Sequence, residues 1–443
     1  MSQAVKETSS YREALRELSE AEGARVPAWV GELRAEALGR FERLGFPTTD
    51  QEDWKYTNVA ALARREFRPA EAAKALDAAQ VEPFLYEEAR GSRLVFVNGH
   101  FNQKLSSLDA LPRGVIAADL ASALRGEHAE LLRERLTRSD RRDVGAFAAL
   151  NTAFLGSGAF IHVPPDVSVA SPVHLLFLST PEAEGAFTPP RVVVVAGRGS
   201  SATVVESYAA LGEAEYFTNA VVEVSLGESA RLVHYKVQAE GERAFHVAST
   251  RAELERAASY DLTTITLGAR LSRHDVEVVL DHEGAECWVD GLYLVGDGQH
   301  ADTHSLIDHR VPRCTSHQNY KGILDGRSRA VFNGRVYVHP DAQQTDAFQS
   351  NKNLLLSSDA RVDTKPQLEI YADDVKCAHG ATVGQLEEEE YFYLVSRGLR
   401  PALARNLLTY GFAEEIVEKI KVGSVKRQLD EAILNRLHAD FEA

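Results

Sequence analysis

Short turns of one repeated kind punctuate the middle of this sequence. They contain Gly or Asp followed by a small residue, as in "LGESA", "EGAEC", "LDGRSRA", "SSDAR" and "YADDV". In the later part of the chain they recur about every 14 to 18 residues, with one gap of double length, which indicates an internal repeat. A period that short leaves room for two or three strands per unit but no helix. The chain is therefore restricted to an architecture of stacked short strands.

Two architectures satisfy this pattern. β-rich runs such as "RVVVVAG", "AVVEVSL", "RLVHYKVQ" and "AVFNGRVYV" alternate with the turns, as they would in a large sandwich or barrel or in the coils of a β-helix. Each coil of a β-helix buries a small apolar face only against its neighbours, and a small residue fits the crowded corner after a turn. The regular small residue favours a β-helix (β-solenoid) core over residues 161–385.

Helical patterns flank this core, so we expect a mainly β chain with helical ends. Residues 1–80 form an N-terminal helical region in which Pro27 begins a helix, and residues 81–160 form a mixed α/β lead-in. Thr49 and Glu52 have the spacing of a capping box ahead of a short helix. The first long helix carries an apolar stripe at steps of three and four residues: Val30, Leu33, Ala37, Phe41 and Leu44.

A C-terminal helical domain is predicted over residues 386–443. Its first helix, in "LEEEEYFYLVSRG", starts with carboxylates, which a helix N-terminus favours, and Gly398 can end it in the left-handed conformation. Pro401 suits the start of the next helix. Large apolar residues then recur at steps of about four: Phe412, Ile416, Ile420, Val425, Leu429, Ile433 and Leu437. Such a stripe can equally pack on its own chain or bind a partner.

Charge and cysteine usage exclude several kinds of partner. The formal net charge of −16 argues against nucleic acid or an anionic membrane as the main partner, because phosphate binding needs concentrated Lys and Arg. The N-terminus has no apolar stretch typical of a signal peptide or a membrane span. Cys287, Cys314 and Cys377 are odd in number and far apart, which is typical of reduced thiols. We therefore expect a cytoplasmic protein.

The sequence lacks the common catalytic motifs. It contains no phosphate loop, no G-x-G-x-x-G after a strand, and no C-x-x-C, H-E-x-x-H or G-x-S-x-G. An iron–sulfur cluster held within one chain usually takes four thiolates, whereas this chain has three cysteines. We therefore expect neither an independent enzyme nor an intrinsic cofactor.

The stretch "DDVKCAHGAT" places two metal-ligating residue types, Cys377 and His379, two positions apart. On a strand such residues point to the same face, so a thiolate and an imidazole could converge there. Two ligands do not complete a tetrahedral site and leave two positions for another molecule. Spacing alone favours the plainer alternative, a buried cysteine beside a turn histidine, although Lys376 could lower the pKa of the thiol.

A second group of candidate ligands lies in "QHADTHSLIDHRVPRCTSH". Its members are His300, His304, His309, His317, Cys314, Asp302 and Asp308. Such a mixture of imidazole, thiol and carboxylate could bind a transition metal. We favour the alternative that these are ordinary polar residues on the coils of a β-helix, because scattered histidines are common.

The block "NYKGILDGRSRAVFNGRVYVHPDAQQTDAFQSNKNLLLSSDARVDTKPQLEIYADDVKCAHGATVGQLEEEEYFYLVSRGL" resembles the core of the SufB/SufD family of iron–sulfur cluster assembly proteins. The resemblance covers essentially the whole chain. "GFPTTDQEDWKYTNV" and "CAHGATVG" are similar to the SufD branch rather than to the SufB scaffold branch. The cysteine that holds the nascent cluster in the scaffold has no evident counterpart in "NKNLLLSSDARVDTKPQLEI".

The resemblance implies a right-handed parallel β-helix and a non-catalytic subunit that pairs with a SufB-like scaffold. It also implies that the C-terminal helices dock a SufC-like ABC-type ATPase. We assign five residues of the apolar stripe to this docking surface: Phe412, Ile416, Ile420, Leu429 and Ile433. The isolated chain could instead pair with a second copy of itself. Iron or a nascent iron–sulfur cluster at the partner interface, and a flavin bound to the complex, are the cofactors that the resemblance suggests.

His379 matches a family histidine at the SufB–SufD interface that is implicated in iron acquisition. The resemblance therefore implies that His379 contributes to a metal site shared with the partner, and Cys377 has a weaker claim to the same role. Two alternatives stay open. The chain could be a SufB-type scaffold that holds a cluster itself, or a stand-alone β-helix hydrolase or lyase that acts on acidic polysaccharide.

Overall fold

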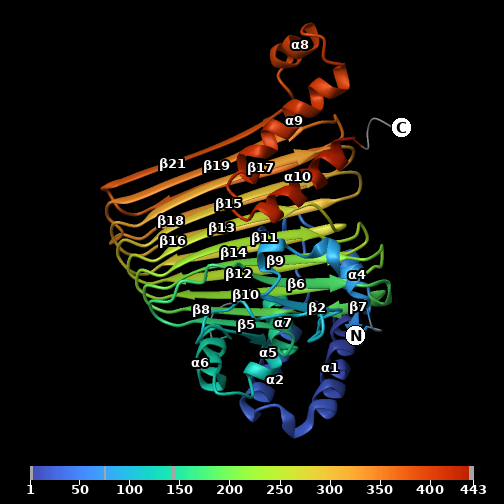
Figure 1. Cartoon of the computed structure of the whole chain (residues 1–443), viewed down its shortest axis with the longest axis vertical. Coiled ribbons are helices and arrows are strands. Elements are labelled where there is room, and N and C mark those ends of the chain that lie inside the picture. The colour runs from blue at the N-terminus through green and yellow to red at the C-terminus, as the bar shows by residue number, and fades with distance from the viewer. Residues whose placement is uncertain (1–2, 74–75, 141–144, 439–443) are drawn as a thin grey trace.

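The computed structural model describes residues 3–73, 76–140 and 145–438, and its main feature is a parallel β-helix (Figure 1). An 11-stranded sheet and a 10-stranded sheet, here called sheet A and sheet B, form its walls. From β8 onward, strands alternate between the sheets along the chain and run parallel within each sheet. The predicted fold class, a β-helix core between helical ends, is confirmed.

Most strands are about ten residues long, so the walls are regular. Sheet A contains β1 (Arg68–Pro69), β4 (Ile116–Asp119), β5 (Gly158–Val163), β7 (Ala186–Thr188), β8 (Arg191–Ala196), β10 (Phe217–Leu226), β12 (Phe245–Leu254), β14 (Leu271–Leu280), β16 (His300–His309), β18 (Arg329–Val338) and β20 (Arg361–Ile370). Sheet B contains β2 (Arg93–Val97), β3 (His100–Phe101), β6 (Val173–Ser179), β9 (Ser201–Ala210), β11 (Arg231–Ala239), β13 (Ser259–Thr266), β15 (Glu286–Val295), β17 (Thr315–Leu324), β19 (Thr345–Leu355) and β21 (Val375–Gly384).

One coil of the β-helix consists of one strand from each sheet and two turns. The residues that occupy one position in successive coils of sheet B are Ser201, Arg231, Ser259, Glu286, Thr315, Asp346 and Lys376. They are 27 to 31 residues apart. The turn period of the sequence is therefore half a coil, a single strand followed by a turn.

Stacked corners explain why small residues follow the turns. Ser229 and Ala257 have φ angles of 57° and 53°, a left-handed conformation that few side chains tolerate. The N–H of Ser229 donates to the carbonyl of Arg256 at 2.8 Å, and that of Ala257 donates to Glu283 at 3.1 Å, which links one corner to the next. Arg313 adopts the same conformation with its side chain exposed, so a large residue is accommodated where it points to solvent.

Glycine and tyrosine interlock inside the later coils. Gly291 of β15 pairs with Tyr320 of β17, and Tyr293 pairs with Gly322 two residues further on. A Cβ atom on Gly322 would lie 2.1 Å from a ring carbon of Tyr293. Both tyrosines are only 1% exposed. Each ring therefore fills the space that the opposite glycine leaves in a close-packed interior.

We expect Gly322→Ala to lower the free energy of unfolding by about 1–3 kcal/mol, the usual cost of overpacking a filled core. The matched control is Gly380→Ala on β21, where no atom lies within 4 Å of the added Cβ. Chemical denaturation of the two variants and the parent chain measures the difference. Equal stability of Gly322→Ala and Gly380→Ala would contradict the interlocked packing.

Helices of the N-terminal half pack around the first coils of the β-helix (Figure 1). They are α1 (Gln3–Glu22), α2 (Ala28–Leu44), α3 (Ala60–Ala63), α4 (Ala78–Val81), α5 (Leu120–Ala123), α6 (Ala129–Asp140) and α7 (Ala146–Ala153). α1, α2 and α7 share an apolar cluster with Phe187 and Phe217 of sheet A. α2, α5 and α6 cover Phe160 and Val193 in the same way. The N-terminal end of the β-helix is therefore covered.

Two local predictions in this region have different outcomes. α2 follows Pro27 as predicted, and its apolar stripe is buried except for Leu44, which is 47% exposed. The capping box at Thr49 is wrong. A single 3-10 turn begins at Glu52, and the residue before it, Gln51, makes no capping hydrogen bond through its side chain. A three-residue turn leaves too few unpaired N–H groups to require such a cap.

The C-terminal domain consists of α8 (Glu388–Ser396), α9 (Pro401–Val417) and α10 (Gly423–His438). α8 ends before Gly398, whose φ angle is 92°, and α9 begins at Pro401, both as predicted. α10 and the second half of α9 lie against sheet B, whereas α8 extends beyond the last coil (Figure 1). No helix in the described part of the chain is long and apolar enough to cross a membrane.

The apolar stripe of these helices packs on its own β-helix. Its buried members are at most 7% exposed: Ile416, Ile420, Val425, Leu429, Ile433 and Leu437. They form one cluster with apolar residues on the outer face of sheet B, including Ile265, Leu292 and Ile323. Phe412 is partly buried, with the Lys321 ammonium 4.4 Å from its ring centre. The assignment of Ile416, Ile420, Leu429 and Ile433 to a partner surface is corrected, because their own β-helix covers them, whereas Phe412 is only partly covered.

Ion pairs fix the same helices to sheet B. Lys321 of β17 donates to the carbonyl of Phe412 at 3.1 Å and to the carboxylate of Glu415. Lys419, after α9, donates to Asp290 of β15 at 2.7 Å. Burial raises the pKa of Asp290 although Lys419 opposes the shift. α9 is therefore anchored to the coils that precede the last one.

Candidate functional site

The last coil of the β-helix is uncovered. β20 and β21 are the final strands of sheets A and B, and no strand within the described ranges pairs with their outer edges. Most residues of β21 are exposed and most of β20 are only half-buried, whereas most residues of β19 are buried. An open sheet edge presents unpaired N–H and C=O groups that can pair with another strand. This end of the molecule, here called the open end, contains Cys377 and His379.

The strand register determines where these two side chains point. Cys377 pairs with Ala347, and His379 pairs with Gln349. Ala347 and Gln349 are 2% and 0% exposed and belong to the inward-facing side of β19. Cys377 and His379 therefore share the inward face, as the two-residue spacing predicted. Their Cα atoms are about 7 Å apart at the usual rise of a strand.

Cys377 is the more enclosed of the two residues. It is partly buried and packs against the main apolar cluster of the β-helix. Burial raises the pKa of its thiol, and the nearby carboxylate of Asp346 raises it further. The expected lowering by Lys376 is therefore wrong for this thiol. A raised pKa makes a thiol less ready to form the thiolate that ligates metals.

His379 lies exposed at the end of a polar row. Gln349, beside it, donates through its amide nitrogen to the amide oxygen of Gln318 at 2.6 Å. Nowhere in the described residues do three or more His, Cys, Asp or Glu side chains gather so that they could hold a metal ion. An iron ion at His379 would therefore need ligands from another molecule, with Cys377 as the nearest second ligand of this chain.

The four histidines of the second group point in different directions. His300 contacts the Thr57 hydroxyl at 2.9 Å, and His304 contacts Asp302 at 3.2 Å, both on the outer face of sheet A. His309 points inward to Ser316 at 2.8 Å, and burial lowers its pKa to about 4. His317, on sheet B, stacks on Trp288 with ring centroids 5.8 Å apart. The four imidazole rings do not converge on one point. The structure therefore favours the alternative that these histidines are ordinary polar residues on the coils of the β-helix.

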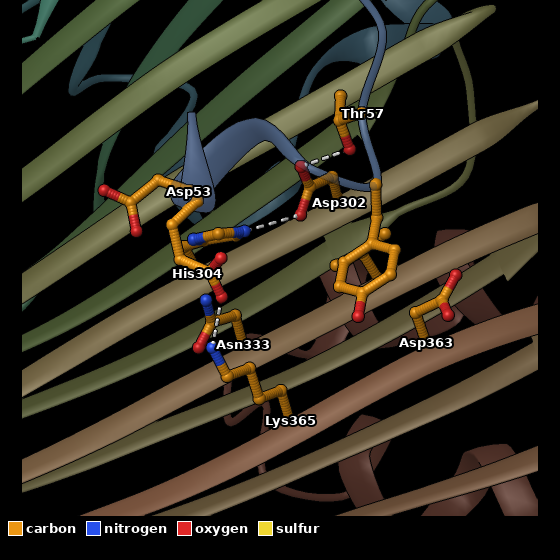
Figure 2. A pocket seen from close by; sticks show the side chains of 10 residues that line it. Asp53, Thr57, Asp302, His304, Asn333, Asp363 and Lys365 are labelled. Carbon is orange, nitrogen blue, oxygen red and sulfur yellow. Dashed lines mark hydrogen bonds and ion pairs between the residues drawn. The ribbon is translucent and has the colours of Figure 1, made fainter. Parts of the chain in front are cut away.

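Asp302 instead holds the N-terminal chain against sheet A. Figure 2 shows its carboxylate between Thr57 and His304. Thr57 donates to it at 2.6 Å and Arg273 at 2.8 Å, while the Arg273 guanidinium lies 3.8 Å from the ring centre of Trp54. Burial opposes ionisation of Asp302, but Arg273 and His304 outweigh it and hold the pKa well below its usual value. The cavity beside this carboxylate, about 10 Å³, has room for one water molecule.

A larger groove of about 550 Å³ lies between residues 44–54 and the outer face of sheet A. Four arginines form part of its lining, and each is paired with a carboxylate. The pairs are Arg191 with Glu223, Arg251 with Glu277, Arg273 with Asp275, and Arg335 with Glu369. A site for acidic polysaccharide needs cations that can pair with the ligand. The groove therefore gives no support to the lyase alternative.

The sequence analysis missed one exposed surface. Phe392 and Tyr393 of α8 are 72% and 56% exposed, and Leu407 of α9 is 47% exposed. These three residues, here called the α8 patch, lie on the helices that extend past the last coil (Figure 1). The signal was present in "EEEEYFYLV". A run of consecutive apolar residues on one helix cannot all face the same side, so some must be exposed or covered by a partner.

Two family models together match nearly the whole chain. Residues 5–175 match the SufBD protein N-terminal region. Residues 177–412 match the model described as SUF system FeS cluster assembly, SufBD core domain, and this match spans the β-helix from the end of β6 onward and most of α9.

Similar proteins carry the same family description. An iron–sulfur cluster assembly SufBD family protein of Synechocystis is 36% identical over 88% of this chain and 87% of its own length. The iron–sulfur cluster assembly protein SufD of Escherichia coli is 31% identical over 90% of this chain and 91% of its own. SufD of Bacillus subtilis is 27% identical, over 91% and 93%. The chain therefore belongs to the SufBD family of iron–sulfur cluster assembly proteins.

Proposed function

We propose that this chain is a non-catalytic, SufD-type subunit of a cytoplasmic complex that assembles iron–sulfur clusters. In this proposal it pairs with a SufB-like scaffold at the open end and docks a SufC-like ATPase on its C-terminal helices. The supporting observation is the open end itself. In a member of this family, the uncovered last coil presents two open sheet edges and the exposed side chain of His379 to a neighbour, which supports this proposal.

The chemical role of the open end is to supply half of an iron site. His379 supplies an imidazole, a common metal ligand in proteins. Cys377 and His379 leave at least two positions of a tetrahedral site for the scaffold to fill. Iron, or the cluster that forms from it, is the cargo of this site and passes on to the scaffold.

The ATPase role follows from the helices that extend past the β-helix. The sequence has no phosphate loop, so ATP hydrolysis must come from a partner. The apolar stripe is largely buried within this chain, whereas the three residues of the α8 patch are exposed, so we assign docking to the α8 patch. Aromatic side chains such as these are enriched at the centre of protein interfaces, where charged residues are depleted.

Co-expression with a SufB-like scaffold and a SufC-like ATPase tests the proposal. We expect affinity purification of this chain to recover both partners in stable stoichiometry, as measured by native mass spectrometry. The isolated chain, reconstituted anaerobically with iron and sulfide, should show no stable cluster absorption in the visible range. Recovery of neither partner would contradict the proposal. A stable cluster on the isolated chain would instead favour the scaffold alternative.

A further inference from the structure

A short column of stacked glutamines lies inside the last coils of the β-helix. Gln318 of β17 and Gln349 of β19 are register partners, and their side chains are buried, at 1% and 0% exposure. The Nε2 of Gln349 donates to the Oε1 of Gln318 at 2.6 Å. The register of the next strand places His379 beside Gln349. The imidazole therefore occupies the position that a third glutamine of the column would take.

The column ends in an acceptor that lacks a donor. The Oε1 of Gln349 is buried, and in the part of the chain that the structure describes it has no hydrogen-bond partner. In a column of stacked amides, each carbonyl oxygen accepts from the next side chain along the axis. Because the Gln349 nitrogen bonds to the preceding coil, this geometry directs its oxygen to the following coil, where His379 lies. A buried acceptor without a donor is costly, so a donor at this place is favoured.

His379 can supply the missing donor. Neighbouring strands lie about 4.8 Å apart, and the two side chains share the inward face, so they are within reach of one another. The imidazole is exposed, and an exposed side chain changes its rotamer readily. A neutral imidazole has one N–H group and one nitrogen with a lone pair. A hydrogen bond from the N–H group to Gln349 therefore leaves the lone pair of the other nitrogen available to a metal.

We propose that Gln349 is a positioning residue: its amide oxygen accepts the ring N–H of His379 and fixes the tautomer in which the other ring nitrogen can ligate iron. Metal-ligating histidines usually donate their second ring nitrogen to a carbonyl or carboxylate in this way. Cys377 has no equivalent support, because its register partner is Ala347. The hydrogen bond is a property of this chain alone, whereas its use for iron rests on the proposed function.

Nuclear magnetic resonance of the full chain labelled with ¹⁵N-histidine tests the hydrogen bond without iron or partners. His379→Ala assigns the signals of this ring. At a pH where the ring is neutral, we expect the parent chain to hold His379 in a single tautomer. Gln349→Leu should give the tautomer mixture of an unrestrained imidazole, whereas Gln349→Glu keeps an acceptor oxygen and should retain the single tautomer. Gln318 can turn its amide to donate to that carboxylate, because its Nε2 has no partner among the described residues.

The matched control is Asn351→Leu, which removes another buried amide from the same strand. Asn351 pairs with Ala381 and does not lie beside His379, so we expect the tautomer of His379 to stay fixed. In the assembled complex, purified anaerobically, Gln349→Leu should lower the affinity for iron by about tenfold or more, and Gln349→Glu by less than about twofold.

Thermal unfolding checks that each variant is folded, and the parent spectrum alone decides the test if Gln349→Leu is not. A tautomer mixture at His379 in the parent chain would overturn the inference, as would a single tautomer that persists in Gln349→Leu. Tighter iron binding by Gln349→Leu would also overturn it, because the amide nitrogen would then be competing for the ligating lone pair. A single tautomer in the parent chain with unchanged iron in His379→Ala would keep the hydrogen bond and overturn the iron site of the proposed function.

Discussion

We expect the His379→Ala variant to assemble the complex normally but to bind iron at least about tenfold more weakly. Even the loss of a residue that only supports a metal ligand lowers metal affinity by about 10- to 100-fold. The His379 side chain is exposed, so we expect its truncation to leave the fold and the assembly of the complex unchanged. The measurement is iron and sulfide per complex, purified anaerobically from cells that carry each variant.

Cys377→Ala is the matched control for this experiment. It removes the other candidate ligating side chain on the same face of β21, but burial and Asp346 raise the pKa of that thiol. We expect iron and sulfide to fall by less than about twofold in this variant. An unchanged iron content in the His379→Ala complex would contradict the proposal that His379 supplies half of an iron site. A larger loss from Cys377→Ala than from His379→Ala would transfer the role to the cysteine.

Phe392→Asp is expected to release the ATPase while the chain keeps its scaffold. Phe392 is 72% exposed, so the change costs the isolated chain little, yet a buried aromatic residue at the centre of an interface is worth about 2 kcal/mol or more. That energy corresponds to a loss of ATPase affinity of about 30-fold. Quantitative pull-down of the ATPase and scaffold in one experiment measures both contacts.

Leu434→Asp is the control for a general effect of acidic substitutions on this domain. Leu434 lies on α10, is 37% exposed, and is separated in sequence from the α8 patch. We expect it to retain the ATPase within about twofold of the parent chain. Retention of the ATPase by Phe392→Asp, or equal loss from both substitutions, would show that the α8 patch is not the docking surface.

The corners of the β-helix could be predicted from the sequence because their physical requirement is local. Positions such as Ser229 and Ala257 need a left-handed backbone in little space, and few residue types satisfy that need. The shared face of Cys377 and His379 could be predicted for a similar reason, since a strand alternates its side chains. Both features depend on chain geometry over a few residues.

The partner of an apolar surface could not be predicted in this way. The spacing of Ile416, Ile420 and Leu429 shows that one side of each helix is buried, but not what covers it. Sheet B covers these helices, because Ile265 and Leu292 on its outer face pack against their apolar side chains. Tertiary contacts of this kind join residues far apart in the chain, and no local pattern encodes them.

Polar residues were hard to interpret for the same reason. His300 and His304 are close to Asp302 in sequence, but their surroundings depend on Thr57 and Arg273, which come from distant segments. The capping prediction at Thr49 failed because the chain there is held against sheet A by Arg273 rather than by a helix start. The structure, not the spacing, decides between a ligand and an ordinary hydrogen-bonding side chain.

The central claim is that this chain contributes a histidine ligand to iron held between two subunits. The most direct test labels only this chain with ¹⁵N-histidine in the assembled complex and records pulsed electron paramagnetic resonance of the reduced, iron-loaded form. The account predicts a ¹⁵N coupling to the iron that disappears in His379→Ala and persists in a variant that lacks His317. Absence of that coupling in the labelled parent complex, with iron present at full occupancy, would contradict it.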